Sequence, residues 1–159
     1  MTAGKSAARL FIVCGLPGSG KTTLSKQLEL QFRAVRLCPD EWMDALEFDL
    51  YDERARGRIE SLQWIFAQNL LALGTSAIIE WGTWGKDVRS QLRIGARRVG
   101  AAVELHFLDI SLDEMFARIR QRNQESPPIE RHDLTKWSNS FERPSPEELD
   151  LYDLVNVVQ

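Results

Sequence analysis

A glycine-rich octapeptide near the start of the chain narrows the choice of fold more than any other segment. Its residues are Gly15-Leu16-Pro17-Gly18-Ser19-Gly20-Lys21-Thr22. It follows a short apolar run at 10–14 and precedes a segment, 22–32, whose apolar residues have helical spacing. The pattern of Gly, four residues and Gly-Lys-Thr is specific when it lies between a strand and a helix. The sequence therefore predicts a loop that binds the phosphates of a nucleoside triphosphate, ATP with Mg²⁺ in our interpretation.

The residue types in this loop suit the binding of an anion. Glycines let the backbone wrap phosphates with successive N–H groups, and the helix that follows points its positive end at them. We expect the Lys21 ammonium to reach the β- and γ-phosphates and the Thr22 hydroxyl to coordinate Mg²⁺. The predicted nucleotide-binding residues are Gly15, Pro17, Gly18, Ser19, Gly20, Lys21, Thr22, Thr23 and Arg118, and the predicted metal ligand is Thr22.

Apolar strands alternate with helical segments along the chain. Strands are expected at 10–14, 34–38, 76–81 and 102–109 with a short fifth at 154–158, and helices at 22–32, from Pro39 onward, at 53–73, 86–99 and 111–122. This alternation indicates a single domain, 1–159, in which a parallel sheet lies between helices. Such sheets bind ligands at the carboxyl ends of their strands, so the loops after Val13, Cys38, Trp81 and Asp109 should share one edge.

Two helices carry patterns that predict which side faces the core. Arg89, Arg93 and Arg97 share one face of the helix at 86–99, and such rows are usually solvated. The helix at 53–73 should be half-buried, and Gly74 is placed to end it. Its expected buried residues are Ile59, Leu62, Ile65, Phe66, Leu70 and Leu73.

Composition and charge limit the classes of partner. The chain has 159 residues, 43% of them hydrophobic, which suffices for one core. A formal net charge of −3 argues against a broad nucleic-acid surface. Cys14 and Cys38 lie in apolar runs and are interpreted as reduced, buried thiols. The run at 10–14 is too short for a signal core or a membrane span, so we expect a cytoplasmic protein.

Six segments together resemble the small P-loop kinases related to polynucleotide kinase, zeta toxins and chloramphenicol phosphotransferase. These segments are the octapeptide, Pro39-Asp40-Glu41, Ile78-Ile79-Glu80-Trp81-Gly82, Leu105-His106-Phe107-Leu108-Asp109, the arginine-bearing helix at 118–122, and Phe141-Glu142-Arg143-Pro144 with Glu147-Glu148. The resemblance implies an α/β fold of the three-layer, nucleoside-kinase-like P-loop type. That fold has a five-stranded parallel sheet with helices on both faces and a lid, here at about 120–140.

The resemblance also implies catalytic roles. The residue matching the catalytic base is Asp40, which would accept the proton of the substrate hydroxyl; a role as helix cap competes with or accompanies this. Lys21 and a lid arginine, Arg122, would stabilise the charge of the transferred group, with Arg118 on the same helix face. Arg131 is a second lid candidate. Glu80 could hold Mg²⁺ through water, contact the acceptor or make a structural hydrogen bond, and Asp109 is a further candidate to assist the metal.

The leading hypothesis is an ATP-dependent phosphotransferase that acts on a hydroxyl of a small molecule. Polynucleotide kinases carry an arginine three residues after the base, but this chain has Met43 there, which argues against a nucleic-acid acceptor. Trp42, Met43, Trp81 and Trp84 could place apolar groups near the edge that binds a small acceptor, although the tryptophans could equally be packing residues. The alternatives are a polynucleotide or nucleotide-sugar kinase, and a regulatory ATPase switch that transfers nothing to a second substrate.

Overall fold

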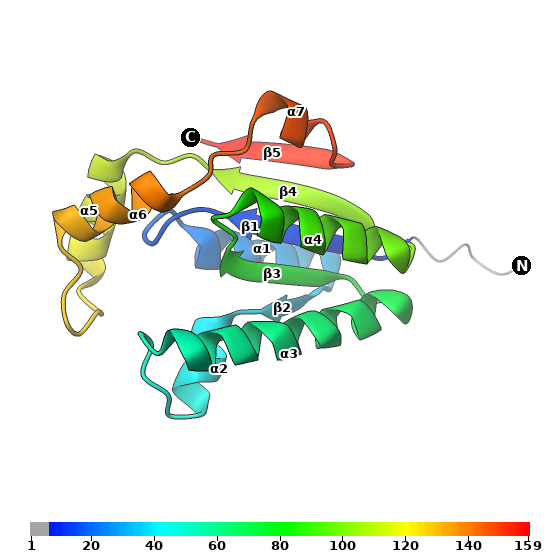
Figure 1. The fold of residues 1–159 in the computed structure, drawn as a ribbon, viewed down its shortest axis with the longest axis horizontal. Helices are drawn as coiled ribbons and strands as arrows, with labels where there is room; N and C mark the ends of the chain where they lie inside the picture. The colour runs from blue at the N-terminus through cyan, green and yellow to red at the C-terminus, as the bar shows by residue number, and fades with distance from the viewer. Residues whose placement is uncertain (1–6) are drawn as a thin grey trace, which may run out of the picture.

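The computed structural model describes residues 7–159 as alternating strands and helices (Figure 1). The strands are β1 (Arg9–Cys14), β2 (Val35–Leu37), β3 (Ala77–Gly82), β4 (Ala102–Leu108) and β5 (Leu154–Val158). The helices are α1 (Lys21–Phe32), α2 (Pro39–Ala45), α3 (Glu53–Ala72), α4 (Lys86–Arg98), α5 (Leu112–Arg122), α6 (Arg131–Ser140) and α7 (Pro146–Leu149). The five expected strands are confirmed.

The strands form one parallel sheet in the order β2-β3-β1-β4-β5. Helix α1 covers one face, and α3 and α4 cover the other (Figure 1). The predicted α/β fold with helices on both faces is therefore confirmed. Because all strands run the same way, the loops after β1, β2, β3 and β4 meet at one edge of the sheet.

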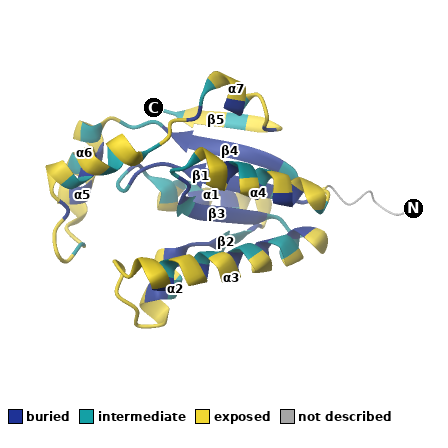
Figure 2. Cartoon of the chain, viewed as in Figure 1, coloured by how far each residue is buried: buried dark blue, intermediate teal, exposed yellow. Residues whose placement is uncertain are grey.

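Strand β1 lies at the centre of the sheet and is buried on both sides (Figure 2). Phe11 and Val13 pack toward α1 together with Leu28. Leu10 and Ile12 belong to the larger core beneath α3 and α4. A continuous apolar run is what a parallel strand with two covered faces requires, so β1 holds the octapeptide on a rigid base.

The buried side of α3 differs from the expected one. The helix turns Ala55, Ile59, Gln63, Ala67 and Leu71 inward. Ile59 was predicted correctly and Leu70 is half-buried, but the other four expected residues are exposed: Leu62 at 59%, Ile65 at 58%, Phe66 at 44% and Leu73 at 74%. Ala55 and Ile59 pack against Met43 of α2, and Ala67 and Leu71 belong to the core beneath α3 and α4. The expected end of the helix is confirmed, since Leu73 is the C-cap and Gly74 follows with a φ of 84°.

The expected solvated arginine row on α4 is wrong for Arg89, whereas Arg97 is exposed as expected. Arg89 is fully buried, and its guanidinium forms two hydrogen bonds to the Glu148 carboxylate at 2.6 and 3.0 Å. Arg93 lies over the Tyr152 ring at 6.0 Å, and Arg97 pairs with Asp153 at 3.3 Å. The row is therefore a seam that joins α4 to the C-terminal segment 148–153.

The cysteines and the remaining helices complete the description of the fold. Both cysteines are buried and free, as expected. Ser111 caps α5 by accepting a hydrogen bond from the Glu114 N–H. Helices α6 and α7 were not predicted from the sequence. Within 7–159, none of the helices has the length and apolar character needed to cross a membrane.

Candidate nucleotide and acceptor site

The octapeptide forms the loop between β1 and α1, as predicted. Gly18 and Gly20 adopt φ angles of 79° and 98°, which side chains other than glycine tolerate poorly. Gly20 is the N-cap of α1 and makes no side-chain capping bond, so the first N–H groups of α1 point into the loop. The Gly15 N–H donates to the Gly82 carbonyl at 3.1 Å, which ties the loop to the end of β3.

Lys21 lies at the first position of α1, and its ammonium donates to the Leu16 carbonyl at 2.9 Å. Burial lowers the pKa of Lys21 to about 8, although the nearby Glu80 and Asp40 carboxylates act in the opposite direction. Arg122 also lowers this pKa. The structure therefore brings Asp40, Glu80 and Arg122 within electrostatic range of Lys21.

Thr22 is exposed, and its hydroxyl donates to Glu80 Oε1 at 2.5 Å. The Glu80 side chain is only 3% exposed, and its second oxygen accepts from Arg36 Nη1 at 2.8 Å. The sequence left Glu80 open between a metal role and a structural hydrogen bond, and the structure places it beside the predicted metal ligand. Sequence reasoning missed Arg36, because a single arginine in a short strand carries no distinctive pattern.

Asp40 lies in the first turn of α2 and is exposed to solvent. Its expected role as helix cap is wrong, because Cys38 is the N-cap and Pro39 fills the first helical position. Asp40 Oδ1 instead accepts from Arg56 Nη2 at 2.5 Å, and Arg56 also donates to the Leu50 carbonyl. Sequence patterns did not predict Arg56, which comes from α3.

The two predicted arginines of α5 line an open pocket of about 650 Å³ beside the octapeptide. Arg118 Nη1 donates to the Ser19 carbonyl at 3.3 Å, and Arg122 pairs with Glu125. The other lining residues are Gly18, Ser19, Gly20, Thr23, Leu24, Gln27, Leu108, Ile110, Val158 and Gln159. Arg131, the alternative lid arginine, pairs with Asp113 and lies over the Phe116 ring.

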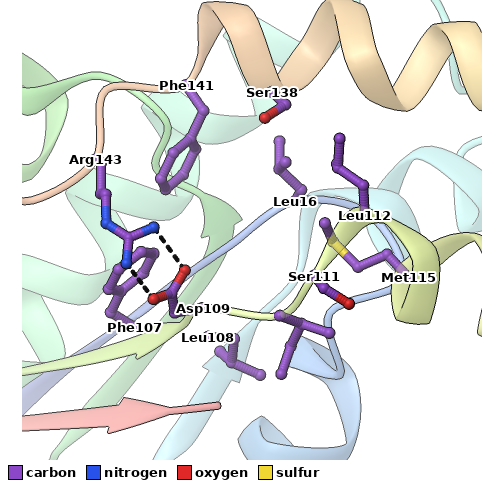
Figure 3. A pocket seen from close by; sticks show the side chains of 11 residues that line it. Leu16, Phe107, Leu108, Asp109, Ser111, Leu112, Met115, Ser138, Phe141 and Arg143 are labelled. Carbon is purple, nitrogen blue, oxygen red and sulfur yellow. Dashed lines mark hydrogen bonds and ion pairs between the residues drawn. The ribbon is translucent and has the colours of Figure 1, made fainter.

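A second pocket of about 390 Å³ lies between the end of β4, the start of α5 and the end of α6 (Figure 3). Asp109 accepts two hydrogen bonds from Arg143 there, one of them at 2.7 Å. Leu16, Phe107 and Phe141 form part of its apolar wall. The structure thus engages Asp109 with Arg143, whereas Glu80 is the carboxylate that contacts Thr22.

The aromatic and apolar residues near this edge are mainly packing residues. Met43 is fully buried between α2 and α3, so it is not a rim residue. The Trp81 indole donates to Gln63 Oε1 at 2.8 Å, and Trp84 packs against Trp137 at 6.2 Å between ring centroids. Trp42 is half-buried against the core beneath α3.

A glycine loop at the carboxyl end of a central parallel strand, with a lysine and a threonine at the following helix start, defines a kinase-like P-loop nucleotide-binding domain. The comparison with protein families agrees, since a family model described as an AAA domain matches residues 10–144. The chain therefore belongs to this AAA domain family. A search of the curated proteins finds no match.

Solved structures share this fold at low sequence identity. The APS kinase CysC of Mycobacterium tuberculosis, in complex with AMPPNP and APS, is 17% identical with a TM-score of 0.66, over 95% of this chain and 88% of that chain. Chaetomium thermophilum Kti12, in complex with ADP-AlF3, is 18% identical with a TM-score of 0.69, over 94% and 88%. A chain of the Pnkp1/Rnl/Hen1 RNA repair complex is 20% identical with a TM-score of 0.74, over 87% of this chain but 45% of that one. These matches confirm the expected small P-loop kinase fold.

Proposed function

We propose that the protein is an ATP-dependent phosphotransferase that moves the γ-phosphoryl group to a hydroxyl of a small molecule. The observation that carries the proposal is the placement of Asp40. This carboxylate is exposed at the sheet edge and lies within electrostatic range of Lys21. An exposed acid beside the phosphate loop suits a general base for a second substrate better than it suits simple nucleotide binding.

In the proposed step, the acceptor hydroxyl oxygen attacks the γ-phosphorus and the bond to the β–γ bridging oxygen breaks. The hydroxyl proton passes to Asp40, and ADP is the leaving group. Arg56 contacts Oδ1 of Asp40, so we assign the proton to Oδ2. Lys21 would exchange its bond to the Leu16 carbonyl for phosphate oxygens, which are stronger acceptors because they are charged.

Arginines of α5 would offset the remaining negative charge. Arg118 already contacts the loop at Ser19, and we propose that it binds phosphate oxygens of ATP. Arg122 lies at the exposed end of α5, at the start of the proposed lid, 120–140. We propose that it leaves Glu125 for the transferred phosphoryl group when the lid closes.

The residues beside the loop fit Mg²⁺. Thr22 offers an exposed hydroxyl oxygen, and Glu80 offers a carboxylate next to it, which are the hard oxygen donors that Mg²⁺ prefers. When bound, Mg²⁺ neutralises charge on the β- and γ-phosphates. We assign Thr22 as its ligand and Glu80 as the group that orients Thr22.

The acceptor is proposed to be a small molecule because the net charge of −3 does not favour a nucleic acid. Met43 is buried, so it does not shape the acceptor pocket as its position in the sequence suggested. The side chain that contacts Asp40 is Arg56, whose guanidinium donates to Oδ1. We further propose that the reaction takes place in the cytoplasm.

The proposal is tested with ATP labelled with ¹⁸O in the γ-phosphoryl group and pooled sugars, nucleosides, nucleotide sugars, antibiotics and 5′-hydroxyl oligonucleotides. We expect mass spectrometry to find label on a small-molecule hydroxyl. Asp40→Asn should reduce transfer by about 10²- to 10⁴-fold, the usual contribution of a general base, while AMPPNP affinity stays within about twofold because Asp40 is not proposed to bind phosphates.

Asp44→Asn is the matched control, because Asp44 is an exposed aspartate on the same helix. This variant should transfer label at the wild-type rate. Label found only on oligonucleotides would contradict the small-molecule assignment, and full transfer by Asp40→Asn would contradict the assignment of the base.

A further inference from the structure

Arg36 on β2 lies where three elements meet and contacts a carboxylate from each. Nη1 donates to Glu80 on β3 at 2.8 Å, and Nη2 donates to Glu41 on α2. Nε lies 3.7 Å from Glu29 of α1. The Arg36 side chain is only 8% exposed, so this guanidinium is a largely enclosed cation at the edge of the nucleotide site.

Arg36 stays protonated and positively charged in this position. Burial acts to lower its pKa, but the hydrogen bonds to Glu41 and Glu80 outweigh burial and raise the pKa above its ordinary value. The planar guanidinium also fixes the direction of each bond, which a lysine ammonium would not do. Arg36 therefore holds Glu80 and Glu41 at fixed positions relative to each other.

The hydrogen bond from Arg36 to Glu80 determines how Thr22 presents its hydroxyl. Thr22 directs its proton to Glu80 Oε1, so the lone pairs of the hydroxyl oxygen remain for a metal ion. Arg36 occupies the other oxygen of the same carboxylate. With both oxygens engaged, the carboxylate has one orientation, and that orientation fixes the Thr22 hydroxyl.

The hydrogen bond from Arg36 to Glu41 acts on the part of the site that contains Asp40. Glu41 directly follows Asp40 in the first turn of α2. A bond between Arg36 and Glu41 therefore ties this turn, with the proposed base, to the strand next to Glu80. In this way one residue connects the proposed metal side to the proposed acceptor side.

We propose that Arg36 is a positioning residue that orients Glu80 toward Thr22 for metal binding and holds the first turn of α2 in register with the phosphate loop. It acts through Glu80 and Glu41 and does not touch the reacting atoms. The inference rests on the proposed function, since it presumes that Thr22 binds the metal of a metal–nucleotide complex. It adds to that function a residue whose loss weakens metal-dependent binding.

The test compares AMPPNP binding with Mg²⁺ and with EDTA by isothermal titration calorimetry. We expect Mg²⁺ to increase the affinity of the wild type for AMPPNP. In Arg36→Gln this increase should be roughly tenfold smaller, because removal of a partner that orients a metal ligand costs 10- to 100-fold. Affinity in EDTA should stay within about twofold, since Arg36 is not a phosphate contact. Arg36→Lys should keep more of the gain than Arg36→Gln because it keeps the charge.

Two further variants separate positioning from a general effect on the fold. Arg98→Gln, which removes an exposed arginine at the end of α4, should keep the full Mg²⁺ effect. The double variant Arg36→Gln/Glu80→Gln should lose no more of the Mg²⁺ effect than Glu80→Gln alone, because Arg36 influences the metal ligand Thr22 through Glu80. If Arg36→Gln does not fold, Arg36→Lys and Glu80→Gln decide the question, with a reduced Mg²⁺ effect expected in both.

The outcomes separate the two proposals. A wild type that does not bind AMPPNP contradicts the proposed function itself. A wild type that binds AMPPNP, together with Arg36 variants that keep its full response to Mg²⁺, overturns the role of Arg36 alone. Equal losses in EDTA and Mg²⁺ would also overturn that role, because they would indicate a structural defect.

Discussion

At the scale of single residues, Lys21 combines burial with a charge that nucleotide binding requires. Its pKa of about 8 reflects the cost of burying an ammonium whose contact in this structure is the Leu16 carbonyl. Bound phosphates would favour the charged form and raise this pKa. Nucleotide binding should therefore take up a proton where the free protein has an uncharged Lys21.

This predicts that Lys21 takes up a proton when ATP binds near pH 8.5 and exchanges almost none at pH 6.5, where its ammonium is charged in both states. ATP affinity should accordingly fall as pH rises above about 8. Calorimetry in buffers of different ionisation enthalpy measures the protons exchanged. Lys21→Arg serves as the control, because arginine stays charged at both values. Equal proton exchange by wild type and variant at pH 8.5 would contradict the lowered pKa.

At the scale of elements, the burial of α3 gives a prediction from two leucines close together. Leu71 is 2% exposed and belongs to the core beneath α3, whereas Leu73 is 74% exposed. Leu71→Ala should lower the free energy of unfolding by about 2–5 kcal/mol, the usual cost of truncating a buried leucine. Leu73→Gln should change it by less than about 0.5 kcal/mol. Urea denaturation compares them, and a reversed order would show that the other side of α3 is buried.

The seam between α4 and the C-terminal segment gives a second prediction. Arg89 and Glu148 are 0% and 2% exposed, so Glu148→Gln leaves a buried arginine without its counter-charge. We expect the free energy of unfolding to fall by about 3–5 kcal/mol. Glu147→Gln removes an exposed carboxylate next to it and should have little effect in the same urea titration. Similar results for both variants would show that the buried pair does not hold the seam together.

At the scale of the whole molecule, sequence patterns predicted what short stretches of chain determine. The octapeptide and the strands around it were predicted correctly because a turn of glycines and a run of apolar residues are local features. The bonds between Arg56 and Asp40, Arg36 and Glu80, and Arg89 and Glu148 join residues 16, 44 and 59 positions apart. Such pairs depend on which helices and strands become neighbours in the fold, and local sequence patterns do not predict these neighbours.

The same limit explains the wrong predictions. Apolar spacing in α3 identified a helix, but it could not tell the large residues that are exposed from the side of the helix that is buried. The spacing of Arg89, Arg93 and Arg97 identified a shared face, but not that the C-terminal segment covers it. Roles for Asp40, Arg118 and Arg122 remain predictions that the site geometry supports through their positions around Lys21 and Ser19.

The central claim is that phosphate leaves ATP for a second substrate. The direct measurement is the ratio of ADP to inorganic phosphate formed by the wild-type protein in the presence of acceptor pools. We predict that at least one pool raises ADP formation without an equal release of phosphate, and that the difference appears as a phosphorylated small molecule. Equal amounts of ADP and phosphate with every pool would contradict the claim and indicate a regulatory ATPase.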